Sequence, residues 1–224
     1  SIDNPIYTRR GSQFTLSAQF TPPYSLFSKK DYKSLYESSS RADREELYRW
    51  IEYYKIKFKS RVYTPLNNSE KYTLVLMGRA DFGLLGSYNK YKQTPFETFH
   101  VGGDGMTGSY TYATETIGLR GYDNGALTPY SDGRAYTRFS MELHFPFLLQ
   151  PSSTIYGLAF VEGGNAWTSL ENFNPFSLKR SAGVGVRIFL PMIGLMGIDW
   201  AYGFDKVQGE KGGGHFHFIL GQEF

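Results

Sequence analysis

The stretch RAYTRFSMELHFPF, residues 134–147, alternates between apolar and polar side chains. Successive side chains of a β-strand point to opposite sides, so Phe139, Met141, Leu143 and Phe145 would share one face. The residues between them are polar or charged and need water or polar partners on the other face. The stretch therefore predicts a β-strand with one apolar and one polar face.

The same two-residue period recurs along the whole chain. Phe14, Leu16, Ala18 and Phe20 alternate with glutamine, threonine and serine, and further on apolar positions alternate with a row of lysines and arginines. The fold class predicted from this period is all-β, an antiparallel meander. Eight strands are expected, at about 12–21, 48–64, 71–86, 134–147, 153–167, 180–190, 194–204 and 214–224.

The connections between these strands alternate in length. PLNNSE, LQPSS and PMIG are short turns, whereas the segments 22–47, 87–133, 168–179 and 205–213 are long. Short turns at one end and long loops at the other are typical of a transmembrane β-barrel, with the short turns on the periplasmic side. By this rule both termini would lie at the periplasmic edge.

A soluble lipocalin-like barrel is the alternative, because it also contains eight alternating strands. Aromatic residues near strand ends favour the transmembrane barrel over the soluble one, since such residues form girdles at the membrane interfaces. These residues are Trp50, Trp167, Trp200, Tyr72 and Tyr202.

Composition excludes several other classes of protein. The 224 residues include no cysteine, which excludes thiolate catalysis, disulfides and cysteine-ligated metals. The 24 basic and 21 acidic residues are interspersed, so nucleic-acid binding is not indicated. No apolar run reaches the ~20 residues of a membrane-spanning helix. The chain opens without an initiator methionine or a signal peptide, so we expect a mature chain or a fragment.

Catalysis is not expected either. Ser140, Glu142 and His144 share one strand face, but at ~6.6 Å spacing along a strand they cannot converge as a triad. His215 and His217 also share a face, with no third metal ligand nearby in the sequence. We therefore predict a protein that is not an enzyme and has no metal or cofactor.

The segment TIGLRGYDNG, residues 116–125, places Arg120 on a tight, small-residue loop. An arginine pushed into a polar interior needs carboxylate partners for its charge. Glu142 and Glu162 lie on neighbouring predicted strands, so they are the predicted partners of Arg120. The further charged positions expected to point inward suit a channel wall or a surface that binds a plug: Arg79, Asp81, Arg138, Arg187 and Asp199.

The motifs FHVGGDG, IGLRGY, SMELHFPF, AFVEGGNAW and HFHFILGQEF follow one another in this order. Over nearly the whole chain the sequence resembles the C-terminal half of the transmembrane β-barrel of the BamA family, which are outer-membrane protein assembly factors. That family has a sixteen-stranded barrel preceded by periplasmic POTRA modules. The resemblance implies that an N-terminal half-barrel and the POTRA modules are absent from this sequence.

The resemblance also assigns site residues. In the family, a loop with a Val-Arg-Gly-Phe-type motif folds into the barrel, and its arginine pairs with acidic residues of the wall. Leu119, Arg120, Gly121 and Tyr122 match this motif within the loop 87–133, and Glu142 and Glu162 match the acidic partners. The family's terminal strand carries an assembly signal and a bend, matched here by Phe216, Phe218, Leu220, Gly221 and Phe224.

The function implied by the resemblance is the assembly and insertion of β-barrel proteins into the bacterial outer membrane by a non-covalent mechanism. The implied partners are the outer-membrane lipid bilayer, unfolded β-barrel client proteins and accessory lipoproteins of an assembly complex, with no nucleic acid. Two alternatives remain open. One is a polypeptide-secreting transporter of the same superfamily, and the other is a simple outer-membrane pore.

Overall fold

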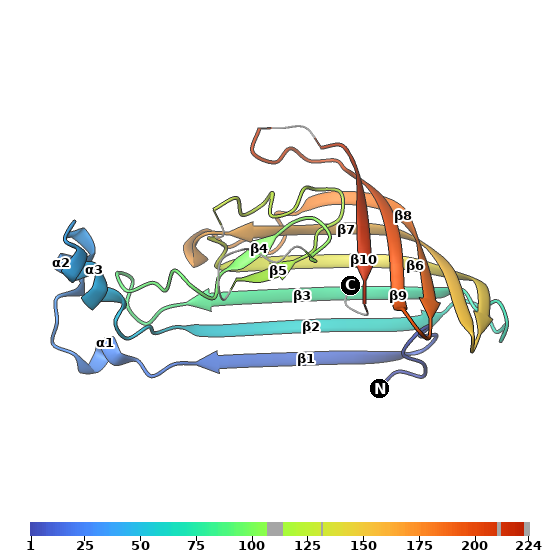
Figure 1. The fold of residues 1–224 in the computed structure, drawn as a ribbon, viewed down its shortest axis with the longest axis horizontal. Coiled ribbons are helices and arrows are strands. Elements are labelled where there is room, and N and C mark those ends of the chain that lie inside the picture. Colours follow the sequence, from blue (N-terminus) through green and yellow to red (C-terminus); the bar gives the residue numbers. More distant parts are fainter. Residues whose placement is uncertain (107–113, 131, 210–211, 222–224) are drawn as a thin grey trace.

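The computed structural model describes residues 1–106, 114–130, 132–209 and 212–221 (Figure 1). Within these residues, eight strands form one sheet in which every strand is antiparallel to its neighbours and strand order follows the chain. The predicted all-β antiparallel meander is therefore confirmed. The strands are β1 (Gly11–Phe20), β2 (Tyr54–Pro65), β3 (Val75–Gly86), β6 (Ala135–Gln150), β7 (Ser153–Trp167), β8 (Lys179–Leu190), β9 (Gly194–Gly203) and β10 (Gly214–Leu220).

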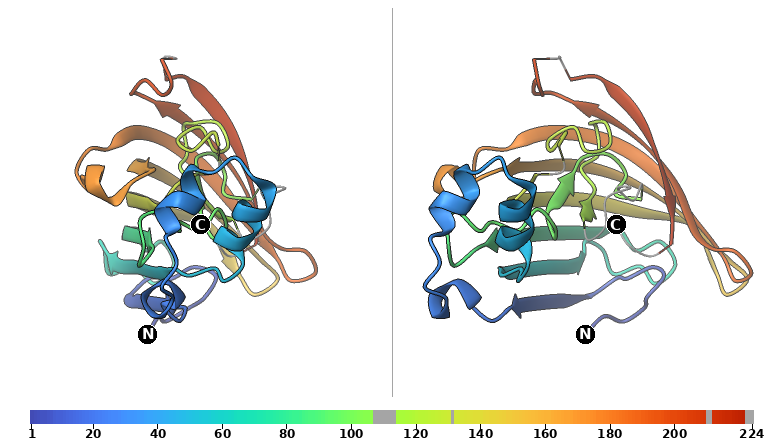
Figure 2. Two further views of the ribbon diagram at one scale, coloured as in Figure 1. Left: turned by 90° about the vertical axis from the view of Figure 1, so that its left-hand side faces the viewer. Right: turned by 60° about the vertical axis from the view of Figure 1, so that its left-hand side comes forward.

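The sheet is open. β1 and β10 are its two edges, and no pairing joins them within the described part of the chain. The predicted transmembrane β-barrel is therefore confirmed only as an open sheet, which curves strongly around the segment between β3 and β6 (Figure 2). The start of β1 pairs with the end of β2, and the end of β10 pairs with the start of β9. The start of β1 and the end of β10 therefore lie at the edge of the sheet that carries the short turns, as predicted for the two ends of the chain.

The start of β2 differs from the prediction. The chain from Arg41 to Tyr48 forms helix α3, so β2 begins at Tyr54 instead of residue 48. Ser40 lies at the N-cap position and Asp43 in the first turn, and an acidic first turn favours a helix. Two shorter helices precede it, α1 (Tyr24–Phe27) and α2 (Tyr32–Glu37).

Other strand limits also move. β3 begins at Val75 instead of residue 71, because the Asn67 side chain accepts from Leu74 N–H and donates to the Tyr72 carbonyl, which fixes a turn there. β6 extends to Gln150 across an irregularity between Pro146 and Leu148. β10 ends at Leu220, and the last predicted positions, 222–224, lie outside the described residues.

The predicted loop 87–133 contains structure of its own. β4 (Phe99–Val101) and β5 (Glu115–Ile117) form a small parallel pair apart from the main sheet. A compact apolar core joins this pair to the sheet wall, and its buried members are Leu85, Phe99, Val101, Ile117, Leu119, Tyr122 and Tyr136. The loop is therefore a packed plug-like unit on the inner face of the sheet.

The two faces of the sheet have opposite character, as the alternation predicts. The inner face buries charged side chains, among them Arg79, Asp81 and Asp199, whereas Phe14 and Leu16 of β1 are 62% and 72% exposed. An apolar outer face and a polar inner face are what a membrane-embedded β-sheet requires. The described helices include none long and apolar enough to cross a membrane.

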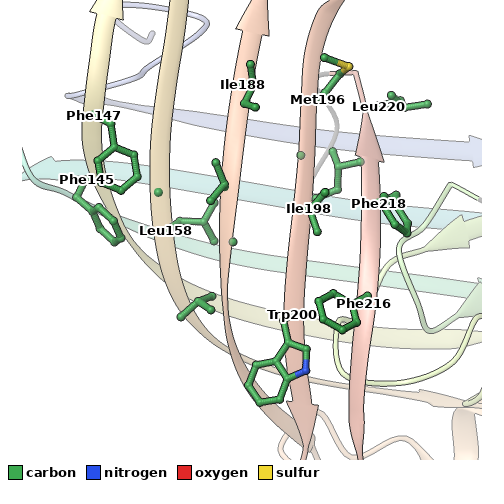
Figure 3. Close-up of a pocket in the computed structure, with 16 residues that line it drawn as sticks. Phe145, Phe147, Leu158, Ile188, Met196, Ile198, Trp200, Phe216, Phe218 and Leu220 are labelled. Atoms are coloured by element: carbon green, nitrogen blue, oxygen red, sulfur yellow. The ribbon is translucent and has the colours of Figure 1, made fainter.

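A hollow of about 990 Å³ lies on the outer face across β6 to β10 (Figure 3). Its lining is almost wholly apolar and includes Phe145, Ile198, Trp200 and Phe216. Glycines 157, 185 and 197 contribute to this lining. The hollow belongs to the apolar outer surface and is separate from the charged inner face.

Candidate functional site

The Leu119–Tyr122 segment lies against the inner face of the sheet. Leu119 is fully buried, and its backbone exchanges two hydrogen bonds with Gly103, of 3.0 and 3.1 Å. Arg138 of β6 donates from Nη1 to the carbonyl of Gly118 at 2.7 Å. These contacts fix the direction in which the next residue, Arg120, enters the interior.

Arg120 is 1% exposed and meets three carboxylates. Its Nη2 donates to Glu142 Oε1 at 2.5 Å and to Glu162 Oε2 at 2.9 Å, and its Nη1 donates to Asp199 Oδ2 at 3.0 Å. The backbone N–H of Arg120 also donates to Glu162 Oε1 at 2.8 Å. The structure thus brings together the arginine and both acids singled out from the sequence, while their role in function stays a prediction.

Sequence reasoning missed the third acid, Asp199. Its position on the polar face of its strand was clear, but nothing in the sequence indicated that a loop arginine could reach β9 as well as β6 and β7. Asp199 also binds Arg187, with oxygen–nitrogen distances of 2.5 and 2.8 Å. It therefore links the loop arginine to a second arginine of the sheet wall.

The charge of Arg120 is stabilised by this setting. Burial lowers the pKa of its guanidinium, but the negative charges of Glu162, Glu142 and Asp199 outweigh burial and raise the pKa above its ordinary value. The guanidinium carbon also lies 3.6 Å from the centre of the Phe160 ring, a cation–π contact. Arg120 is therefore positively charged at any physiological pH.

Gly121 allows the loop to approach the wall closely. Its φ is +90°, and an added Cβ would lie 2.7 Å from Ser181 Cβ and 3.1 Å from Gly203 N. Its N–H donates to His217 Nε2 of β10 at 2.9 Å. A side chain at this position would force the backbone away from β8, β9 and β10.

Tyr122 completes the motif. Its hydroxyl donates to the Arg180 carbonyl of β8 at 2.6 Å, and burial raises its pKa to about 12, so it stays a neutral donor. Together Arg120, Gly121 and Tyr122 contact each of the strands β6 to β10. The motif therefore fastens the loop to the last five strands of the sheet.

The predicted terminal-strand residues lie elsewhere. Phe216, Phe218 and Leu220 of β10 point outward and are exposed, and Gly221 has a φ of +98°, which is consistent with a bend at the strand end. Phe224 lies outside the described residues. These side chains do not contact the Arg120 cluster, and their role as an assembly signal stays a prediction.

Ser140, Glu142 and His144 are held by structural contacts. Ser140 Oγ and Glu142 Oε1 both accept from Arg120, and Glu142 Oε2 lies 2.7 Å from His144 Nε2. Among the described residues no group of three His, Asp or Glu could hold a metal ion. The ion pairs of Arg120 with Glu142, Glu162 and Asp199 anchor the loop to the sheet wall.

Asp199→Asn is expected to lower the free energy of unfolding by about 1.5–3 kcal/mol, because hydrogen bonds to two buried arginines lose their charged acceptor. Urea-induced unfolding in detergent micelles measures the change. Asp205→Asn is the control, since Asp205 pairs with the exposed Arg180. Equal midpoints for the two variants would contradict the assigned role of Asp199.

The loop is also tied to β2, through Glu115. Lys57 Nζ lies 2.9 Å and Lys55 Nζ 3.3 Å from Glu115 Oε2. Burial raises the pKa of the Glu115 carboxyl, but its bonds to Lys57 and Lys55 outweigh burial and lower the pKa below its ordinary value. A lowered folded-state pKa means that this tether stabilises the loop above the ordinary carboxyl pKa and is lost as the pH falls through the lowered value.

Glu115→Gln is accordingly expected to cost about 1 kcal/mol at neutral pH and almost nothing in strong acid. Hydrogen exchange of the β4 amides measures the effect, with faster exchange in the variant at neutral pH. The two proteins should converge once the pH falls below the lowered pKa of the Glu115 carboxyl, where the wild-type carboxyl is also protonated. A difference that persists unchanged in acid would contradict the charge-based tether.

The sheet is open and antiparallel, with an apolar outer face and a charged inner face, and three carboxylates of its wall hold a loop arginine. These features define a class of protein, the outer-membrane β-sheet proteins with an internal loop anchor. The sequence matches the Omp85 superfamily domain over residues 1–224, and the chain belongs to this superfamily. It is an integral protein of the bacterial outer membrane.

Comparison with solved structures agrees with this assignment. The fold is similar to the crystal structure of BamA from Haemophilus ducreyi lacking POTRA domains 1-3, with a TM-score of 0.67 and 18% sequence identity. The match covers 98% of this chain and 40% of that chain. The expected resemblance is confirmed for the superfamily and the fold, and this chain spans two fifths of the length of the matched structure.

Proposed function

We propose that this chain is the C-terminal part of a machine that inserts β-barrel proteins into the outer membrane without covalent chemistry. The observation that carries the proposal is the edge strand β10, which has no strand partner on one side within the described part of the chain. The internal loop is fastened to β10 and to the four strands β6 to β9. An unpaired strand edge is a template for pairing with another chain.

The backbone of β10 indicates which groups would pair with a client. Gly221 N–H donates to Leu195 of β9, whereas Leu220 N–H points the other way and donates to Met106 Sδ at 3.1 Å. Because N–H directions alternate along a strand, Phe216 and Phe218 present their N–H groups to the free edge. A client strand would add to β10 there.

The proposed partners are the lipid bilayer, unfolded β-barrel clients and accessory lipoproteins. A buried unpaired backbone group costs several kcal/mol in lipid, so a strand of an incoming client gains by pairing with an edge already in the membrane. This pairing lowers the barrier to insertion and needs no catalytic residue, metal or cofactor.

The test reconstitutes the intact protein in liposomes and follows the folding of a urea-unfolded β-barrel client by its heat-sensitive gel mobility. Clients are expected to fold faster with the protein than in empty liposomes. Phe218→Pro should abolish the acceleration, because proline removes a free-edge N–H and leaves the ladder to β9 in place. Phe218→Ala is the matched control and should retain it.

Equal client folding with and without the protein would overturn the proposal. Release of an added polypeptide into the vesicle lumen, without membrane-embedded product, would instead indicate the transporter function of the same superfamily. Loss of activity in both variants would show that the Phe218 side chain matters more than the strand edge.

A further inference from the structure

The loop and the edge strand β10 are joined by a hydrogen bond whose acceptor can be titrated. The N–H of Gly121 donates to Nε2 of His217 at 2.9 Å, and the His217 side chain is 5% exposed. A backbone N–H can only donate, so Nε2 must carry a lone pair for this bond to exist. His217 therefore holds the loop only as a neutral imidazole.

A proton on Nε2 would turn this attraction into a conflict. Two N–H donors would then face each other at a distance that suits a donor and an acceptor. Histidine is the side chain that ordinarily gains a proton between about pH 5 and pH 8. The Gly121 N–H cannot become a hydrogen-bond acceptor, so it cannot bind a protonated Nε2 of His217.

The charges that face His217 come from three directions. On the loop side Arg120 opposes a second positive charge and Asp104 favours it, and on β9 Asp199 pairs with His217 in register and favours it. On β10 itself the ring of His215 stacks 6.2 Å away and opposes it. Burial of the ring also opposes a positive charge on His217.

We propose that His217 is a proton-sensitive latch that fastens the Leu119–Tyr122 loop to β10 when neutral and releases it when protonated. The sign is fixed by the geometry: the bond is present at high pH and lost as the pH falls. Arg120 stays paired with Glu142, Glu162 and Asp199 throughout, so the release is confined to the edge strand. The latch does not depend on the proposed insertase function.

Hydrogen exchange of the Gly121 amide, measured by NMR on the intact protein in nanodiscs, tests the latch. His217→Gln is the reference variant, because its side-chain oxygen accepts a hydrogen bond at every pH. Residues next to Gly121 in the sequence are unchanged, so the ratio of wild-type to variant exchange rates cancels the intrinsic effect of pH. We expect a ratio near one at about pH 8 and at least roughly fivefold faster wild-type exchange at about pH 5.

His215→Gln is the matched control and should keep the pH dependence of the Gly121 amide. A ratio that stays constant with pH, or a pH dependence that disappears in His215→Gln, would overturn the proposal. Wild-type protein alone gives a second readout that needs no variant. The ¹⁵N resonance of the His217 ring and the Gly121 amide resonance should move with one midpoint, and a ring that titrates without moving the amide would also overturn it.

Discussion

Arg120→Ala is expected to lower the free energy of unfolding by about 3–5 kcal/mol, because it leaves buried carboxylates without their shared cation. Glu142, Glu162 and Asp199 are each at most 6% exposed. Repulsion among them would add to the cost of their burial. Urea-induced unfolding in detergent micelles, followed by tryptophan fluorescence and gel mobility, measures the loss.

Arg180→Ala is the control for the removal of an arginine from the same sheet. Arg180 is exposed and pairs with Asp205 at the sheet rim, and exposed ion pairs contribute little to stability. Its unfolding midpoint should stay close to that of the wild type. If Arg120→Ala shifted the midpoint no further than Arg180→Ala, the three-carboxylate cluster would not anchor the loop.

A second substitution separates charge from packing. Adding Glu142→Gln to Arg120→Ala removes one of the unpaired charges, so the double variant should be more stable than Arg120→Ala alone. The same Glu142→Gln change in the wild type should be destabilising, because it weakens the bond to Arg120. Opposite signs in the two backgrounds would show direct coupling between the residues.

The strands could be predicted because each has one face of polar or charged side chains and one apolar face. Every inward charged position on β3 and β6 that the alternation indicated, from Arg79 to Glu142, is buried in the structure. The same parity placed Glu142 and Glu162 on the face that the loop reaches. The alternation of apolar and polar residues is a local property, so it can be seen in a single sequence.

What could not be predicted depends on distances across the sheet. Asp199 of β9 binds the same guanidinium as Glu162 of β7, and this depends on the curvature of the sheet. Closure of the sheet depends on whether the two edges meet, which the alternation does not encode. The predicted start of β2 was six residues too early, because helix α3 runs to Tyr48 and strand pairing with β3 begins only at Tyr54.

Gly121→Ala is the second large effect that we expect. A residue with a side chain costs about 1–2 kcal/mol at a positive φ such as the +90° of Gly121. The added Cβ would also press on Ser181 and on the backbone of β9, and such overpacking costs about 1–3 kcal/mol more. Arg120 and Tyr122 flank this position, so the strain would pull both from their partners.

Gly194→Ala isolates the backbone term. Gly194 has a φ of +93°, and an added Cβ would meet nothing within 4 Å. Gly194→Ala should therefore lower the free energy of unfolding only by the cost of the positive φ. Gly121→Ala should lower it by that cost and by the cost of overpacking. Urea unfolding measures both variants, and protease cleavage of the loop reports whether it has left the wall. Equal losses in the two variants, with the loop still protected, would show that the close approach of Gly121 to β8 and β9 is not needed to hold the motif.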